Sequence, residues 1–146
     1  MKTAYWDTSL LLKLYLIEEG SHAVQSKVRD WEIIYSSEIA FSEIYSSFHR
    51  KYRERAYTKI EMEHCMNQFE LDMHHGLISL IPSEELIHQR VAAVYRKLSD
   101  KIFLRAPDAI HLATCEITGF KSIYTHDQRM KQAAPFFNLK AVDILV

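Results

Sequence analysis

Four acidic residues stand where this chain could bring carboxylates together. Asp7 lies in "YWDTS", Glu43 in "SEI", Asp108 in "APDAIHLATC" and Asp127 in "YTHDQRM". Carboxylate oxygens are the ligands that hard divalent cations such as Mg²⁺ and Mn²⁺ prefer in proteins. Two such ions about 3.5–4 Å apart can activate a water molecule and stabilise a leaving oxygen. The four acids are therefore candidates for both catalytic and metal-ligating roles.

Each acid also has an ordinary structural interpretation. Asp7 and Asp127 suit helix N-caps. Glu43 suits a solvated helix face, and Asp108, directly after Pro107, suits the first turn of a helix. If the four converge, however, each close pair repels by on the order of 1 kcal/mol in water and about 4 kcal/mol at an effective dielectric of 20. A divalent cation would resolve this conflict, because no lysine or arginine lies in "YWDTSLL" beside Asp7.

The chain alternates strand-like and helix-like segments. The expected strands cover 2–6, 32–37, 76–82, 120–125 and 139–145. Between them we expect helices that are identified by their caps and apolar spacing. They cover 9–20 with Gly20 as the C-terminal signal, 21–30, 38–54, 58–76 with a capping box of Thr58 and Glu61, 84–98 with Ser83 as N-cap, 106–115, and a short stretch from 128.

This alternation predicts an α/β fold with a mostly parallel sheet covered by helices on both faces. In such a sheet each strand ends, and the next helix begins, at the carboxyl edge, which is where α/β sheets bind ligands. Asp7 and Asp127 follow strands, whereas Glu43 and Asp108 lie early in helices. All four acids are therefore expected to converge on this edge.

Composition limits the classes of protein that need consideration. The 146 residues are 48% hydrophobic, which suits a single domain over 1–146 with its own core. The net charge of −1 means that the protein as a whole does not attract polyanions. The cysteines Cys65 and Cys115 are expected to be reduced thiols. No apolar run approaches the roughly 20 residues of a membrane span, and the start shows no signal-peptide pattern. We expect a soluble, unprocessed, cytoplasmic protein.

Four short motifs in order, "YWDTS", "SEI", "LRAPDAIHLATC" and "YTHDQRM", resemble the PIN domain, and specifically the VapC-type toxins of type II toxin–antitoxin pairs. The resemblance implies a three-layer α/β/α sandwich whose five-stranded sheet has the order 3-2-1-4-5. It also implies an endoribonuclease that depends on Mg²⁺, or alternatively Mn²⁺, held by Asp7, Glu43, Asp108 and Asp127. Ser9 and Thr125 match hydroxyl positions that support these acids.

The same resemblance implies partners. They are an RNA substrate (transfer or ribosomal RNA), a cognate VapB-like antitoxin and a second copy of the chain. The helical region 38–76 is the one candidate protrusion for binding the antitoxin or forming the dimer. Its methionine-rich helix, 59–75, is expected to be ordinary core, with a dimer face or antitoxin groove as the alternative.

Basic residues near this region are candidates for contact with RNA phosphates. Arg50, Lys51, Arg53 and Arg55 follow one another in "FHRKYRERAY", and a solvated helix end explains them equally well. Arg105 and Arg129 are expected at the rim of the acidic edge.

Two further side chains share the Asp108 face of the helix. Cys115 lies about 10 Å along the helix axis from Asp108, too far to share an ion. His111 and Cys115 are therefore expected to pack or to support the acids, although the role of His111 stays open.

Three alternatives compete with a metal-dependent ribonuclease. A metal-free ribonuclease would use two of the eight histidines as acid and base. A phosphoacceptor signalling domain would want an acidic pair after the first strand, and Asp7 has no acidic neighbour before Glu18. A catalytically silent PIN-like module for RNA binding or protein interaction is disfavoured by four intact acids.

Overall fold

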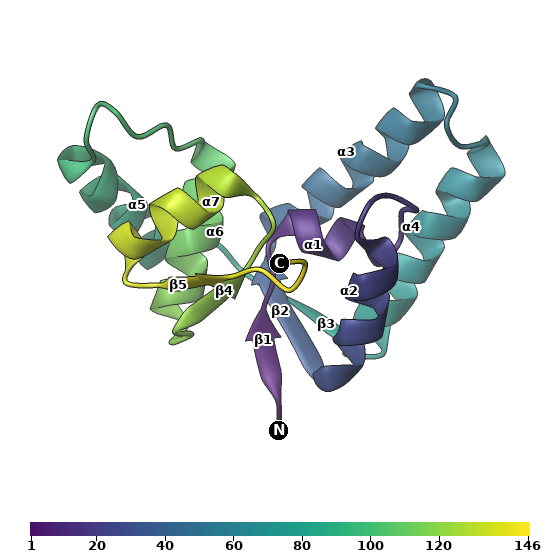
Figure 1. Ribbon diagram of the computed structural model, residues 1–146, viewed down its shortest axis with the longest axis horizontal. Helices are drawn as coiled ribbons and strands as arrows, with labels where there is room; N and C mark the ends of the chain where they lie inside the picture. Colours follow the sequence, from purple (N-terminus) through teal and green to yellow (C-terminus); the bar gives the residue numbers. More distant parts are fainter.

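Strand β1 (Thr3–Tyr5) is the centre of a parallel strand arrangement in the computed structural model, which describes all residues 1–146 (Figure 1). It pairs with β2 (Ile33–Ser37), which pairs with β3 (Ile78–Ile81). Strand β4 (Ser122–Tyr124) pairs with β5 (Lys140–Val142). A single parallel bridge, Trp6 to Tyr124, joins the two groups and places β4 beside β1. This agrees with the expected order 3-2-1-4-5, but the strands pair as a three-stranded and a two-stranded sheet and not as one continuous five-stranded sheet.

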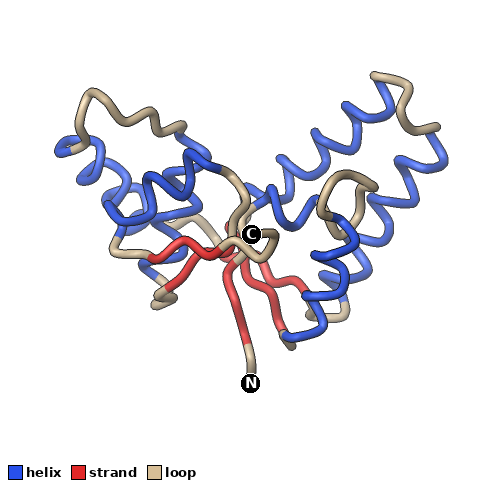
Figure 2. The backbone as a smooth tube through the Cα atoms, viewed as in Figure 1, coloured by secondary structure: helices blue, strands red, loops and turns tan.

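The bridge between the two groups lies at the carboxyl end of β1. There the Trp6 N–H donates to the Tyr35 carbonyl at 2.9 Å, and the next residue, Asp7, donates its N–H to the Tyr124 carbonyl at 3.1 Å. Elsewhere β1 and β4 are not paired, and the strands spread apart toward the N-terminus (Figure 2). Asp7 therefore sits where the two groups of strands meet.

Helices cover both faces of the strands. On one side lie α1 (Thr8–Leu12), α2 (Ser21–Lys27), α3 (Ile39–Arg53) and α4 (Lys59–His74), with the 3-10 turn η1 (Val28–Asp30). On the other side lie α5 (Glu85–Lys97), α6 (Ala106–Ile117) and α7 (Gln128–Ala133), with η2 (Ala134–Phe137).

Side-chain alternation along β1 separates the two cores. Ala4 and Trp6 belong to the core beneath α1 to α4, whereas Tyr5 belongs to the core beneath α5 to α7. A strand imposes this period of two. The three-layer α/β/α arrangement with parallel strands is thus confirmed. No helix combines the length and the apolar character needed to cross a membrane.

Helices α3 and α4 form a hairpin that projects from the molecule (Figure 1). The predicted capping box is present: the Glu61 N–H donates to Thr58 Oγ1 at 3.1 Å, and the Thr58 N–H donates to Glu61 Oε1 at 2.9 Å. The expected apolar stripe of α4 is buried in the core beneath α1 to α4, through Met62, Cys65 and Phe69. Whether the hairpin binds a partner stays a prediction.

The first helix is shorter than predicted. It ends at Leu12 instead of continuing to Gly20, and Gly20 is the N-cap of α2, with φ of 87°. Lys13 Nζ stabilises the intervening turn by donating to Glu18 Oε1 at 3.0 Å and to the Glu19 carbonyl at 2.6 Å. Leu16, which lies in this segment, is buried in the core beneath α1 to α4.

Ser83 is not a helix cap, contrary to the prediction. The N-cap of α5 is Glu84, which makes no side-chain capping bond, and the buried Ser83 hydroxyl has no hydrogen-bond partner. The Ser83 N–H instead donates to Glu38 Oε1 at 2.8 Å, which orients the chain as it enters α5.

These two sites predict opposite outcomes for similar substitutions. Thr58→Ala removes a true cap and should lower the free energy of unfolding by about 1 kcal/mol. Ser83→Ala removes only an unpaired hydroxyl and should change it by less than about 0.5 kcal/mol. Urea denaturation followed by circular dichroism measures both. A loss at Ser83 as large as the loss at Thr58 would contradict the assignment of Glu84 as the cap.

Candidate active site

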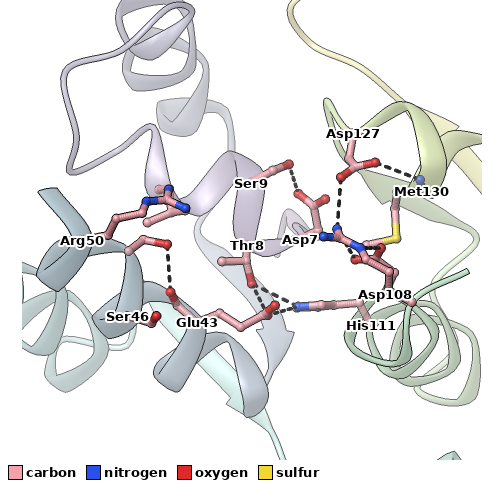
Figure 3. A pocket seen from close by; sticks show the side chains of 13 residues that line it. Asp7, Thr8, Ser9, Glu43, Ser46, Arg50, Asp108, His111, Asp127 and Met130 are labelled. Atoms are coloured by element: carbon pink, nitrogen blue, oxygen red, sulfur yellow. Dashed lines mark hydrogen bonds and ion pairs between the residues drawn. The ribbon is translucent and has the colours of Figure 1, made fainter. Parts of the chain in front are cut away.

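A cavity of about 380 Å³ opens at the carboxyl edge of the strands, between α1 and α3 on one side and α6 and α7 on the other (Figure 3). All four predicted acids line it, although they come from different parts of the chain. The lining is mainly polar, since Leu12 and Met130 are its two hydrophobic members. The others are Asp7, Thr8, Ser9, Glu43, Ser46, Ser47, Arg50, Arg105, Asp108, His111 and Asp127.

Asp7 is held by three donors and is 2% exposed. Its Oδ1 accepts from Ser9 Oγ at 2.7 Å and from the Leu10 N–H at 3.2 Å, which makes Asp7 the N-cap of α1. Its Oδ2 accepts from Thr125 Oγ1 at 2.6 Å. Burial raises the pKa of Asp7, against the lowering effect of the hydrogen bonds from Thr125 and Ser9. The orientation of this carboxylate is therefore fixed, at a cost in desolvation.

Glu43 lines the same cavity from α3 and is bound by a different pair of side chains. Its Oε1 accepts from Thr8 Oγ1 at 2.7 Å and lies 2.9 Å from His111 Nε2. Partial burial alone would raise the pKa of Glu43, but the hydrogen bond and charge of His111, with the bond from Thr8, outweigh it and the pKa is lowered.

His111 connects Glu43 to the core. It is 1% exposed, and its Nδ1 lies 3.0 Å from the Tyr5 hydroxyl. A carboxylate can only accept, so His111 Nε2 carries the proton that it donates toward Glu43. His111 is thus a buried donor aimed at one of the four acids.

Asp108 and Asp127 share one cation. Arg105 Nε donates to Asp108 Oδ2 at 3.0 Å, and Arg105 Nη2 lies 3.6 Å from Asp127 Oδ2. Burial raises the pKa of Asp108, while the hydrogen bond and charge of Arg105 oppose the rise. Asp127 is the predicted N-cap of α7, with Oδ1 accepting from the Arg129 N–H at 2.8 Å and the Met130 N–H at 3.2 Å.

Arg105 offsets part of the carboxylate repulsion, a role that the sequence did not predict. The sequence predicts a divalent cation as the charge that offsets this repulsion, and it places Arg105 at the rim of the acidic edge. The structure places its guanidinium against Asp108 and Asp127 inside the cavity lining. A helix start explains the contact, because Arg105 is the N-cap residue of α6 and lies three residues before Asp108.

The donor chemistry of the cavity suits a hard divalent cation. Four carboxylates and the hydroxyls of Thr8 and Ser9 supply oxygen ligands, the type that Mg²⁺ and Mn²⁺ prefer. In the conformation observed, no three His, Cys, Asp or Glu side chains are arranged to hold one ion. Arg105 would have to release Asp108 and Asp127 before both acids could serve as ligands. The residues fit the ion by type, but because no three of them are arranged to hold one ion, binding also requires their side chains to rearrange.

The remaining candidates divide into two groups. Arg50 lines the cavity, whereas Lys51, Arg53 and Arg55 continue along the end of α3 without forming ion pairs. Arg129 stacks on Phe103, with its guanidinium 4.6 Å from the ring centre.

Cys115 lies away from the cavity, as expected. It is fully buried, and its thiol contacts the Ser122 carbonyl at 3.4 Å.

Sequence reasoning missed Thr8 and left the role of His111 open. Thr8 adjoins Asp7 in "WDTS", and His111 lies one turn after Asp108, so both stood next to recognised acids. Their contact with Glu43 joins positions 35 and 68 residues apart, which no local pattern reveals.

Residues 4–135 match the model of the PIN domain. The chain belongs to the PIN domain family. The predicted resemblance is therefore confirmed at the level of the family. A search by sequence among curated proteins gives no significant match.

Solved structures share the fold of this PIN domain at low identity. A chain of a toxin–antitoxin complex from Klebsiella pneumoniae is 18% identical with a TM-score of 0.65, and each chain is covered to 97%. The VapC20 toxin of Mycobacterium tuberculosis, which cleaves the sarcin–ricin loop, is 11% identical with a TM-score of 0.68, covering 89% of this chain and 94% of that one.

A chain of VapBC2 from Rickettsia felis, bound to a DNA fragment from its promoter, is 12% identical with a TM-score of 0.68 and covers 97% of this chain and 98% of that one. At these identities the likeness establishes the fold alone.

The His111 contact predicts a pH effect in this PIN domain. His111→Ala removes the largest of the contacts that lower the pKa of Glu43, so the pKa of Glu43 should rise, although Thr8 and Arg105 still lower it. The sign follows for stability: a carboxyl with a lowered folded pKa stabilises the fold above its unfolded pKa and loses this contribution as pH falls. The variant should lose that contribution at neutral pH.

Carboxyl carbon NMR resonances of Glu43, titrated from pH 3 to 8, measure the shift. His111→Gln, which keeps an N–H donor, serves as the matched control and should retain part of the lowering. An unchanged Glu43 midpoint in His111→Ala would show that the contact does not act on Glu43 in solution.

Proposed function

We propose that the chain is a Mg²⁺- or Mn²⁺-dependent endoribonuclease that hydrolyses RNA phosphodiester bonds. One observation carries the proposal: in a PIN domain, four carboxylates from separate elements line a single cavity at the carboxyl edge of the strands. Burying Asp7 and Asp108 is costly, and their raised pKa values record that cost. A cation-dependent reaction gives a reason for the arrangement.

The residues that would hold the cation are Asp7, Glu43, Asp108 and Asp127. A divalent cation bound there supplies an activated water and offsets the charge that develops on the phosphate. Ser9 and Thr125 keep the Asp7 carboxylate in one orientation. Hydrolysis of this kind leaves a 5′-phosphate and needs no 2′-hydroxyl, so preference for RNA must come from contacts outside the four acids.

The basic end of α3 is our candidate for those contacts. Arg50 lines the cavity, and Lys51, Arg53 and Arg55 extend from it. Because none of the four forms an ion pair within the chain, their charges are available to phosphates. The overall charge of −1 makes this local cluster necessary for RNA attraction.

We further propose that the chain is a cytoplasmic toxin of a VapBC-like type II pair, which inhibits translation by cutting transfer or ribosomal RNA. Support comes from the fold shared with VapC20 and with chains of toxin–antitoxin complexes. A VapB-like antitoxin and a second copy of the chain are the proposed partners. The α3–α4 hairpin is their proposed surface, with Ile60 79% and Leu71 45% exposed.

The alternatives have less support. A metal-free ribonuclease needs paired histidines, but His111 is the one histidine that lines the cavity. A silent binding module would carry the cost of the buried acids without using them.

The proposed activity predicts that purified chain cleaves RNA with Mg²⁺ or Mn²⁺ and stops in excess EDTA. Asp7→Asn should reduce the rate by at least about 100-fold, because the acid is both ligand and anchor of the cavity. Asp30→Asn, a change of the same kind at an exposed ion pair with Lys27, should cleave normally. The amount of product over time measures the rates, and mapping of the product ends should find 5′-phosphates. Full cleavage in EDTA would refute the mechanism.

The proposed toxin role predicts that induced expression arrests bacterial growth and that Asp7→Asn relieves the arrest at equal protein level. Growth curves with immunoblots test this, and RNA ends mapped after brief induction identify the target. Equal arrest by both forms would contradict poisoning by catalysis. Cleavage in vitro without arrest would retain the nuclease and reject the toxin.

A further inference from the structure

Arg105 takes up carboxylate oxygens that a divalent cation would need. Its Nε and Nη2 donate to Oδ2 and Oδ1 of Asp108, at 3.0 and 3.4 Å. The same Nη2 lies 3.6 Å from Asp127 Oδ2, while Asp127 Oδ1 caps α7. A single guanidinium thus faces both oxygens of Asp108 and the one oxygen of Asp127 that is not committed to the helix.

The two side chains of the Arg105–Asp108 ion pair differ in how exposed they are to solvent. The Asp108 side chain is 8% exposed and fixed in the first turn of α6, whereas the Arg105 side chain is 48% exposed. Ion pairs with such an exposed partner are weak, because water competes for the charged groups. The guanidinium is therefore the freer member of the pair and the one that can leave.

No other cation takes this place. Helix α7 carries two basic residues, and both have other partners. Lys131 is paired with Asp143, and the Arg129 guanidinium lies over the Phe103 ring. Arg50 lines the cavity but forms no ion pair. Without Arg105, Asp108 and Asp127 would face each other across the cavity with no opposing charge.

We propose that Arg105 is a displaceable counter-ion of the cavity: its guanidinium holds Asp108 and Asp127 in place while no divalent cation is bound, and a cation must displace it before both acids can serve as ligands. The inference rests on the metal dependence proposed above. Arg105 is then a positioning residue that acts through the two acids and sets the cation concentration at which the site fills.

Displacement leaves the guanidinium at the cavity. Its backbone is the N-cap of α6, so the side chain stays tethered at this edge after it releases the acids. Its donors are then free for an RNA phosphate, for which the planar guanidinium is well suited. The exchange explains how a residue expected to contact RNA is found paired with carboxylates.

Direct Mn²⁺ binding tests the proposal without measuring cleavage. Free Mn²⁺ is quantified by electron paramagnetic resonance in titrations of the wild type, Arg105→Gln, Arg105→Lys and Arg129→Gln. Arg105→Gln should bind Mn²⁺ about three- to fivefold more tightly, since the competing charge is gone. Arg105→Lys keeps the charge without the fork and should fall between the two. Arg129→Gln, which removes an equal charge next to the cavity, should stay within about twofold of wild type.

A second readout follows the guanidinium itself. The Arg105 Nε–H gives a ¹H–¹⁵N signal that Arg105→Gln identifies by its loss. It should exchange slowly without metal and acquire the shift and fast exchange of a free arginine as Mg²⁺ saturates the site. Circular dichroism melting in EDTA confirms that each variant is folded.

Two outcomes would overturn the proposal while leaving the nuclease in place: Mn²⁺ affinity unchanged or weaker in Arg105→Gln, or an Arg105 signal that stays protected in saturating Mg²⁺. Failure of every form to bind Mn²⁺ would reject both this inference and the metal dependence. Tighter binding by Arg105→Gln without any RNA cleavage by the wild type would retain the counter-ion and reject the ribonuclease.

Discussion

Repulsion among four carboxylates is the constraint that organises this edge of the molecule. Asp7 and Asp108 are 2% and 6% exposed, so water cannot screen them as it would on the surface. Every acid has a partner: hydroxyls and a backbone N–H for Asp7, Thr8 and His111 for Glu43, and one shared arginine, Arg105, for Asp108 and Asp127. Together these partners act as a scaffold that keeps the acids apart and oriented.

The strand topology creates the room for this arrangement. β1 and β4 are linked by one bridge at their carboxyl ends, and the residue after the bridge is Asp7. Parallel strands deliver the following helices to the same edge, so α1 and α3 approach from one core while α6 and α7 approach from the other. The cavity lies between the two cores, with Asp7 at their junction.

Local rules and topology account for what the sequence could reveal. Asp7 and Asp127 were predicted because they follow strands, and the capping box at Thr58 because its pattern is complete within four residues. The prediction of Ser83 as a cap was wrong because the N-cap is the residue with extended backbone at the start of the helix, and here that residue is Glu84. The Glu43–His111 contact depends on how two helices that are distant in the sequence pack. The Arg105 contact depends on which of several nearby acceptors this long side chain reaches. Neither contact produces a pattern that can be recognised in the sequence.

Fold alone does not establish what a PIN domain does, since one fold can carry different activities. The energetics of this site distinguish further between the activities. Burial raises the pKa values of Asp7 and Asp108, which means that the folded state disfavours their charged forms. Charged groups held against that penalty, each oriented by dedicated donors, are the arrangement expected of a site where a cation and a phosphate must be placed together.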